Sequence, residues 1–368
     1  MRTIGPYKII GVENPEDGVA SDPEIVWFDT SVLIDLETFY FGTGKLVRER
    51  EHLRDVLLAF PRGLIGMTDI RVFSGPGIAE ASWSRAGVFD HSRARRMRHM
   101  ARQVLGWSPD EVRKAFANRH APIGRDKSWP PPLEVSTDPG NFERTHPLPL
   151  LVGSYGYILY LSHLARTQKE WEHKGKLWAL EEVNRWAMEE IDVRFAYETY
   201  LAVALFLEPG PQMDLARKML KLGRHPSGPD DIARWAYGVA WDLWFLRQVD
   251  GSSLGYSPHP GEKGARRTCV VTKDGDPLFV RSNSRVATVI TDGKSPLVFM
   301  HNTFGDSLKH QQEVSRLLDF EPSNIMDLYY RGLRDSEELL ERAMDAVDRL
   351  ELSLGVQERT VPGYRATL

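Results

Sequence analysis

Carboxylates follow apolar runs at widely separated places in this sequence. Asp29 comes directly after the apolar run 25–28, and Asp274 follows the run CVVT with one residue between them. Glu80 lies where a helix is expected to open, shortly after the break formed by Pro76 and Gly77. An unpaired buried carboxylate is costly. These acids therefore lie on solvated turns, or the fold gathers them around something positive.

Such acids would form a site made only of oxygen ligands. Carboxylates and water are the ligands that Mg²⁺ and Mn²⁺ prefer in proteins. A fourth acid, Asp242, lies on an expected helix that leads toward the strand before Asp274. The carboxyl ends of parallel strands line one edge of a sheet, the usual place for a ligand. The candidate catalytic and metal-binding residues are therefore Asp29, Glu80, Asp242 and Asp274.

The third position of this set has a rival in Asp231. Asp231 and Asp242 are about three helical turns apart and would lie nearly on one face of a helix. They would be roughly 16 Å apart along its axis, so both cannot bind one metal pair. Asp230 and Asp231 follow Pro229, where acids favour a helix N-terminus electrostatically. Asp242 lies among aromatic and apolar residues without such a reason, so it is the preferred candidate.

The elements that would position these acids alternate between strand and helix. The sequence predicts a strand at 25–28, a helix capped by Thr30 or Ser31, a helix near 47–60 and a second strand within 63–73. This order favours a parallel sheet covered by helices. Residues 1–22 have the composition of a loose lead-in.

The later sequence changes character. Residues 147–208 are mostly helical and aromatic, strand signals return only in 267–275, 285–293 and 296–301, and the end is helical and charged. The predicted fold is thus an α/β protein with a parallel sheet core flanked by helices, a mostly helical insertion and a helical C-terminal region. The predicted ranges are 23–86 for the first part of the core, 87–227 for the insertion, 228–305 for the second part and 306–368 for the C-terminal region.

Four motifs follow one another along the chain: FDTSVLIDL, GIAEASWSR, AWDLWFL and VVTKD. They resemble the acidic motifs of the PIN-domain family of metal-dependent nucleases, which includes the toxin ribonucleases of toxin–antitoxin pairs, and the resemblance implies that the parallel sheet core is PIN-like. The resemblance covers roughly residues 24–85 and 228–295. It matches the family's acids to Asp29, Glu80, Asp242 and Asp274. The gap between the second and third acids is far longer than a compact PIN domain needs.

The resemblance implies hydrolysis of phosphodiester bonds with Mg²⁺ or Mn²⁺, and RNA is favoured over DNA as substrate. Thr30, Ser31 and Thr272 would support the acids or position the substrate. One alternative is a PIN-like module that binds nucleic acid or protein without cleaving. A third interpretation makes the helical region an interaction surface on an inert α/β core. The insertion is expected to shape substrate access, mediate homo-oligomerisation or hold a protein regulator.

Charge also limits the function. The net charge of −4 gives no global positive field, so any polyanion must be drawn by a local patch. The run HSRARRMRHMAR, residues 91–102, supplies candidate nucleic-acid contacts, although a solvated helix face is an equally ordinary role for it. Asp35 and Glu37 are expected on a solvated face. The candidate contacts are Arg93, Arg95, Arg96 and Arg98.

The remaining features favour a cytoplasmic protein. The single cysteine, Cys269, excludes an intramolecular disulfide and suits a reducing compartment. No secretory signal is expected at the N-terminus. The apolar run 148–165 is interrupted by glycines, a serine and a histidine, so it falls short of a membrane span, which needs about 20 apolar residues.

Overall fold

The chain forms a mostly helical α/β protein with one small mixed sheet. Its contacts divide it into two compact units, and each is described by itself. The sheet unit comprises residues 1–84, 88–146 and 248–275, and the helical unit comprises 85–87, 147–247 and 276–368. The computed structural model describes residues 2–11, 23–42, 49–60, 71–84, 89–117, 148–167, 174–193, 195–208, 210–253, 267–290, 297–302 and 335–361.

The sheet has the strand order β1-β2-β5-β3-β4. The central strand β3 pairs in parallel with β4 on one side and β5 on the other, and Phe28 of β3 lies opposite Val271 of β5. This register brings the carboxyl ends of β3 and β5 to the same edge. The strand bounds are β1 Arg2–Ile4, β2 Tyr7–Ile10, β3 Ile25–Phe28, β4 Arg71–Phe73 and β5 Thr268–Thr272.

The expectation of a parallel sheet holds only for β4, β3 and β5. The first residues, expected to be a loose lead-in, form the β1–β2 hairpin, and β2 pairs antiparallel with β5. Gly5 adopts a positive φ of 55° in the tight turn, a conformation that glycine takes readily. Strands of three and four residues are too short to give a clear periodic signal, so the sequence pattern did not predict the hairpin.

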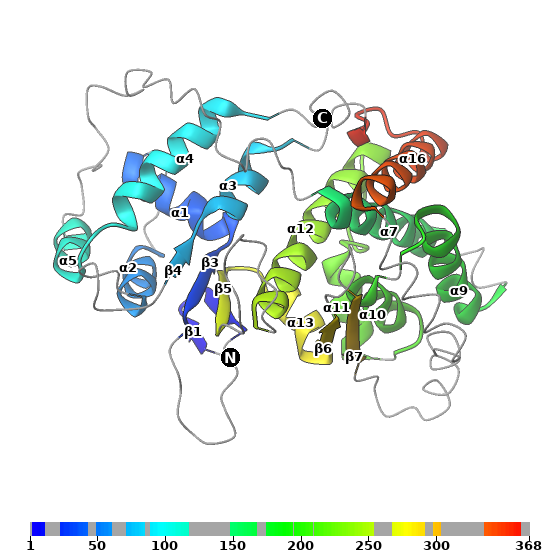
Figure 1. The fold of residues 1–368 in the computed structure, drawn as a ribbon, viewed down its shortest axis with the longest axis horizontal. Coiled ribbons are helices and arrows are strands. Elements are labelled where there is room, and N and C mark those ends of the chain that lie inside the picture. The colour runs from blue at the N-terminus through cyan, green and yellow to red at the C-terminus, as the bar shows by residue number, and fades with distance from the viewer. Residues whose placement is uncertain are drawn as a thin grey trace. The chain divides into compact units, whose positions relative to one another are not determined.

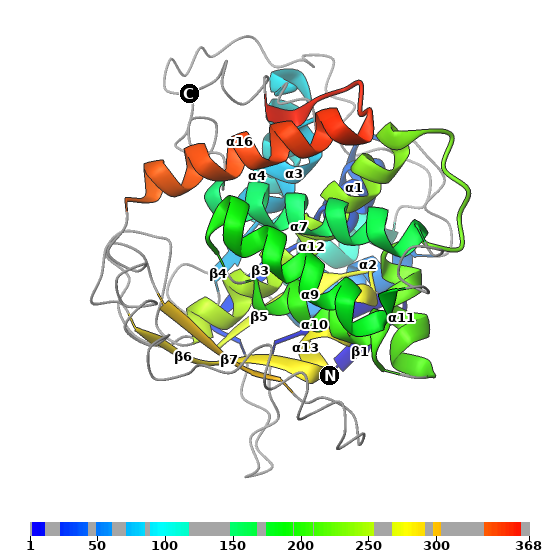
Figure 2. The ribbon, with the colours of Figure 1, turned by 90° about the vertical axis from the view of Figure 1, so that its right-hand side faces the viewer.

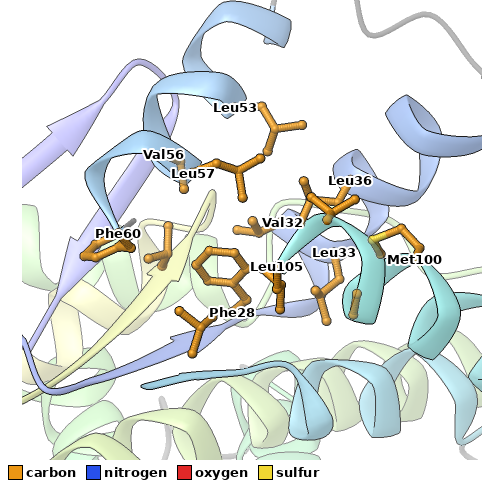
Figure 3. Packing of buried hydrophobic residues seen from close by; sticks show 14 of the residues in the cluster. Phe28, Val32, Leu33, Leu36, Leu53, Val56, Leu57, Phe60, Met100 and Leu105 are labelled. Carbon is orange, nitrogen blue, oxygen red and sulfur yellow. The ribbon is translucent and has the colours of Figure 1, made fainter. Parts of the chain in front are cut away.

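The helices of the sheet unit surround one apolar cluster. Val32, Leu33 and Leu36 of α1 are fully buried, and Leu53 and Val56 of α2 and Met100 of α4 join them, as Figure 3 shows. Burying such side chains is the dominant favourable contribution to folding. The helices concerned are α1 Thr30–Phe41, α2 Arg50–Ala59, α3 Gly75–Ser82, α4 His91–Val104 and α5 Pro109–Ala117 (Figure 1).

The helical unit contains a bundle and a separate β-hairpin. Its strands β6 and β7 pair only with each other among the described strands, in antiparallel orientation. The elements are α7 Leu148–Arg166, α9 Lys176–Trp186, the π-helix η1 Ala187–Ile191, α10 Ala196–Phe206, α11 Pro211–Met219, α12 Pro229–Ser253, α13 Asp276–Asn283, β6 Ser284–Ile290, β7 Leu297–Asn302 and α16 Ser336–Leu354. The last residues of α12, 248–253, are counted with the sheet unit.

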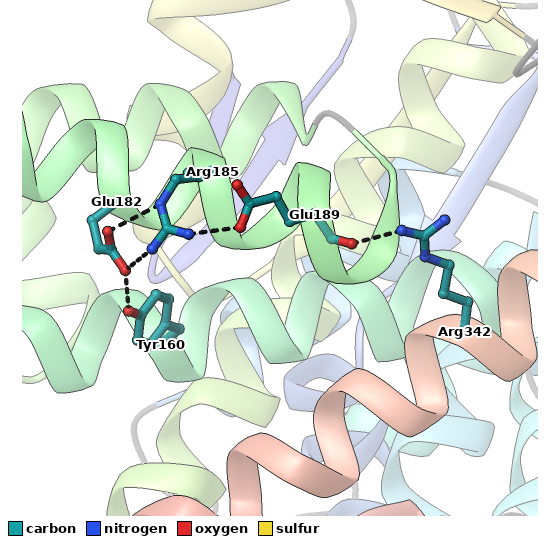
Figure 4. A network of polar contacts seen from close by, with 5 residues as sticks. All are labelled: Tyr160, Glu182, Arg185, Glu189 and Arg342. Atoms are coloured by element: carbon teal, nitrogen blue, oxygen red, sulfur yellow. Dashed lines mark hydrogen bonds and ion pairs between the residues drawn. The ribbon is translucent and has the colours of Figure 1, made fainter.

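The bundle is held by both packing and polar contacts. Helix α16 runs across α7 (Figure 2), where the Tyr155 hydroxyl donates to the buried Glu351 carboxylate at 2.6 Å. Arg185 on α9 pairs with Glu182 and Glu189, and the guanidinium of Arg342 on α16 donates to the Glu189 carbonyl (Figure 4). Exposed pairs of this kind add little each, so the buried contacts dominate.

Several expected elements fall elsewhere than the sequence suggests. Helices α4 and α5 lie within the range expected as an insertion, yet they belong to the sheet unit, whereas β6 and β7 belong to the helical unit. Of the second predicted strand only residues 71–73 are described. Residues 306–334 of the C-terminal region, which is expected to be helical, lie outside the described residues, whereas Ser336–Leu354 of that region forms α16. No helix in the described ranges is long and apolar enough to cross a membrane.

Candidate functional site

Asp29 occupies the junction between β3 and α1. Its backbone has the extended conformation of a helix N-cap, but its carboxylate makes no capping hydrogen bond to α1 within the described chain. The side chain is only 5% exposed. Its Oδ2 instead accepts hydrogen bonds from the Ser31 hydroxyl at 2.7 Å and the Thr272 hydroxyl at 2.6 Å. The ordinary explanation, that Asp29 caps the helix, therefore does not account for this carboxylate.

The same two hydroxyls bind the turn that follows β5. The Lys273 N–H donates to Ser31 Oγ at 3.1 Å, and the Asp274 N–H donates to Thr272 Oγ1 at 3.0 Å. Because each hydroxyl accepts from this turn and donates to Asp29, the positions of Asp29 and the turn are coupled. Asp274 itself has an exposed side chain. Ser31 and Thr272 thus both hold the Asp29 carboxylate, and their predicted role at a metal site stays a prediction.

Glu80 reaches the same edge from α3. Its Oε2 lies 2.5 Å from the Thr30 hydroxyl, which also lies 2.9 Å from the Gly77 carbonyl oxygen. A hydroxyl has one proton and donates it to one acceptor at a time. The Thr30 hydroxyl is therefore shared between the Glu80 carboxyl group and the Gly77 carbonyl oxygen.

Gly77 allows α3 to approach the end of β3. A Cβ at this position would lie 2.6 Å from the Phe28 carbonyl oxygen and 2.7 Å from Leu33 Cδ1. Both distances are too short for a side chain, and one partner is backbone that cannot move aside. Glu80 is three residues further along the helix, so the absence of a Cβ at Gly77 is what brings it beside Thr30. The sequence presents Gly77 only as a chain break, and its close approach has no sequence signal.

The electrostatics link the three carboxylates. Burial raises the pKa of Asp29, the hydrogen bonds from Thr272 and Ser31 oppose that rise, and the charge of Asp274 adds to it. Burial also raises the pKa of Glu80 well above its usual value, and the charge of Asp29 raises it further. Acids that raise one another's pKa values concentrate negative charge in one place, and such a place attracts a cation.

The donor set fits a hydrated divalent cation better than a closed metal cage. Among the described residues, no group of three or more His, Cys, Asp or Glu side chains is arranged to hold an ion by itself. Mg²⁺ usually keeps several waters and binds through one or two carboxylates. Asp29 and Glu80 are both oxygen donors, and the charge of Asp29 raises the pKa of Glu80, so this pair meets that requirement.

The two rivals for the third acid lie on α12 in the helical unit. Asp231 accepts from the Ser227 N–H at 2.8 Å and pairs with Arg234 at 3.2 Å, the local role expected of an acid at a helix N-terminus. Asp242 is half-buried between the buried Trp241 and Leu243. Because Asp242 belongs to the other unit, its membership of the site stays a prediction.

Asp35 and Glu37 are not on a solvated face, and that expectation is wrong. They are 8% and 6% exposed, because α1 packs against β5 and against the helices α2, α3 and α4. Each has a distant partner: Asp35 accepts from Tyr7 and Lys273, and Glu37 pairs with Arg96 at 2.5 Å. Buried acids survive where such partners exist, and partners this far away in sequence cannot be read from the pattern.

The candidate arginines of α4 have unequal surroundings. The Arg96 guanidinium is engaged with Glu37, so its first role is structural. Arg95 has an exposed side chain and Arg93 and Arg98 are half-buried, while Ala94, Met97 and Met100 face the core. Arg93 also gives its backbone N–H to the capping carboxylate of Asp90. Their contact with nucleic acid stays a prediction.

Comparisons with protein-family models, with curated proteins and with solved structures found no match for this chain. The site is therefore defined by its own geometry. The resemblance of its motifs to those of PIN-domain nucleases stays a prediction.

Proposed function

We propose that this chain is a metal-dependent nuclease that hydrolyses phosphodiester bonds, with RNA favoured as substrate. The observation that carries the proposal is the convergence on one sheet edge of Asp29, Glu80 and the turn of Asp274, with Asp29 held by Ser31 and Thr272 instead of capping α1. Asp242 is proposed as the fourth acid. A buried carboxylate such as Asp29, with further acids beside it, is costly to maintain, so a role in binding a cation is a reason for its presence.

Asp29 and Glu80 would hold a hydrated Mg²⁺ or Mn²⁺ ion, and Asp274 would add its charge from the exposed turn. When bound, such ions activate a water and neutralise charge on the phosphate and the leaving oxygen. Asp29 has little freedom to move, because two hydroxyls fix one of its oxygens. Asp274 is exposed. Solvent and substrate would therefore approach the site from the side of Asp274.

The reaction needs no further co-reactant. The oxygen of a water forms a bond to phosphorus, the bond from phosphorus to the leaving oxygen breaks, and the proton released by the water ends on the products or the buffer. The Thr30 hydroxyl lies against the Glu80 carboxyl group and fixes its orientation.

The basic face of α4 is the proposed contact for the phosphate backbone. Residues 91–104 contain five arginines and no acid, and Arg95 and Arg102 are exposed. Like charges on one helix face repel one another, and arginines near a helix N-terminus oppose its dipole. An anionic partner would offset both costs. Helix α4 packs against α3, the helix that carries Glu80.

Cleavage of single-stranded RNA tests the proposal. Wild type in Mn²⁺ or Mg²⁺ is expected to degrade the RNA, and EDTA is expected to abolish the activity. Asp29→Asn keeps the size of the side chain but removes its charge, so we expect a loss of activity of about 100-fold or more. Asp110→Asn is the matched control, because Asp110 is an exposed aspartate of the same unit that pairs only locally with Arg113.

Equal cleavage by wild type and Asp29→Asn would show that the site is assigned wrongly. If neither protein cleaves single-stranded RNA or DNA but both bind RNA, the chain is a binding module and not an enzyme. Binding is measured in parallel by fluorescence anisotropy, so that an effect on cleavage is separated from an effect on substrate binding.

A further inference from the structure

A buried polar cluster lies directly behind the turn that carries Asp274. The Asp35 carboxylate accepts from the Tyr7 hydroxyl at 2.7 Å and from the Lys273 ammonium at 2.8 Å, both at Oδ2. The ammonium also lies 5.9 Å from the centre of the Tyr7 ring. Tyr7 is fully buried, Asp35 is 8% exposed, and the two come from β2 and α1. Three distant parts of the chain therefore meet at Lys273.

The backbone of Lys273 is held as firmly as its side chain. Its N–H donates to Ser31 Oγ at 3.1 Å, and its carbonyl oxygen accepts from the Lys8 ammonium at 3.3 Å. The Lys8 ammonium also lies close to Gly275, since a Cβ at Gly275 would come within 2.6 Å of the Lys8 nitrogen. Backbone N–H, backbone carbonyl and side chain of one residue are thus all engaged, and that residue lies between Thr272 and Asp274.

We infer that Asp35 is a positioning residue, which acts with Tyr7 through Lys273 to fix the turn that carries Asp274. Lys273 would otherwise have a long, flexible side chain next to the acidic edge. Asp35 draws its ammonium away from Asp29 and Asp274, so that the cation does not neutralise them. The part of this inference that concerns metal binding rests on the proposed function, and the part that concerns the turn does not.

Stability alone is a weak explanation for this cluster. A buried ion pair often stabilises a fold no better than apolar residues of the same size. Partners of this kind around ligating groups, in contrast, orient them and tune their affinity for a metal. The N-terminal hairpin, which supplies Tyr7 and Lys8, is thereby part of the site although it bears none of the acids.

Amide hydrogen exchange of the metal-free protein tests the effect on the turn. In Asp35→Asn we expect residues 273–275 to exchange at least about tenfold faster than in wild type, with slow exchange retained in α5 as an internal reference. Tyr7→Phe removes one of the two hydrogen bonds and is expected to give a smaller change in the same direction. Circular dichroism shows whether Asp35→Asn folds. If it does not fold, the exchange of residues 273–275 in Tyr7→Phe tests the inference instead.

The matched control is Glu37→Gln. Glu37 is on the same helix, is buried to the same extent and is likewise paired with a cation, but its partner is Arg96 on α4. Breaking that pair is expected to speed exchange in α4 and to leave residues 273–275 unchanged. Wild-type exchange at 273–275 in a folded Asp35→Asn protein would overturn the inference.

Mn²⁺ affinity, measured by electron paramagnetic resonance, tests the consequence for the metal. We expect the affinity to fall about 10- to 100-fold in Asp35→Asn and to stay at the wild-type value in Glu37→Gln. Faster exchange without any fall in affinity would overturn the positioning role. If wild type and Asp29→Asn bind Mn²⁺ equally, the proposed metal site is wrong, while the exchange result still decides whether Asp35 fixes the turn.

Discussion

At the scale of single residues, the site is held in a state that the metal-free fold tolerates poorly. Asp29 is buried and Glu80 is half-buried, and the charges of Asp29 and Asp274 both disfavour the ionised form of Glu80. Two hydroxyls compensate Asp29, whereas Glu80 shares a single hydroxyl with the Gly77 carbonyl. Glu80 is therefore the group whose ionisation costs the folded protein most, and its replacement should change stability in a pH-dependent way.

We predict that Glu80→Gln stabilises the metal-free protein at neutral pH. Below the ordinary pKa of about 4.5 the carboxyl is protonated in both folded and unfolded chains and has no effect. As the pH rises, the unfolded chain loses the proton first, so the stability of wild type falls until the raised folded pKa is passed. Glutamine removes this destabilisation, and we expect a gain of about 0.5–2 kcal/mol, measured by urea unfolding in EDTA.

The pH dependence distinguishes this effect from ordinary repacking. The gain should be small at pH 4 and large at pH 7.5, and an equal gain at both values would contradict the prediction. Glu111→Gln is a control of opposite sign, because the Ser108 N–H and hydroxyl lower the pKa of Glu111 at the start of α5. That substitution should destabilise the protein at neutral pH and not at pH 3.

At the scale of elements, α3 reaches the strand edge because one of its residues has no side chain. A Cβ at Gly77 would clash with the Phe28 carbonyl oxygen of β3 and the side chain of Leu33 of α1. This close approach sets the distance between Glu80 and Thr30. Asp29 and Asp274, in contrast, are placed by the parallel register of β3 and β5.

We predict that Gly77→Ala pushes α3 away from β3. The added methyl group overpacks the contact and should cost about 1–3 kcal/mol of stability. Displacement of Glu80 should lower nuclease activity by about 10- to 100-fold. Gly238→Ala in α12 is the matched control: nothing lies within 4 Å of a Cβ there, so it should stabilise the helix by about 0.5–1 kcal/mol. Full activity in Gly77→Ala would contradict the proposed role of α3.

At the scale of the whole molecule, the net charge of −4 means that RNA binding depends on local charge. The exposed residues Arg95 and Arg102 are seven positions apart on α4, close to two helical turns, and so lie on one face. They are the arginines from which counterion release is expected. Arg96 should contribute less, since it pairs with Glu37.

We predict that the double substitution Arg95→Gln with Arg102→Gln weakens RNA binding and its salt dependence together. For single strands the slope of log K against log salt changes by about 0.7 for each phosphate that the protein no longer neutralises. The slope should therefore fall by about 1.4, as measured by anisotropy over a salt series with Asp29→Asn as background. Arg113→Gln, an exposed arginine of α5 that pairs with Asp110, should leave the slope unchanged.

The sequence by itself determined the local features of this protein. In both IVWFDTS and VVTKD an apolar run is combined with a hydroxyl residue and an acid. This pattern predicts that Asp29 and Asp274 lie at strand ends, because strand and turn preferences depend on neighbours along the chain. The alternation of strand and helix likewise indicates the parallel pairing of β3 with β4 and β5.

Only the tertiary structure decided which charges are compensated and how closely elements approach. The sequence pattern makes Asp35 and Glu37 surface acids, but their partners are a strand tyrosine, a turn lysine and a helix arginine far along the chain. The sequence pattern also indicates that Gly77 interrupts the chain between elements. In the structure, the missing Cβ of Gly77 lets α3 approach β3 closely. Burial, pairing and close contact are properties of residues distant in sequence, so no local pattern contains them.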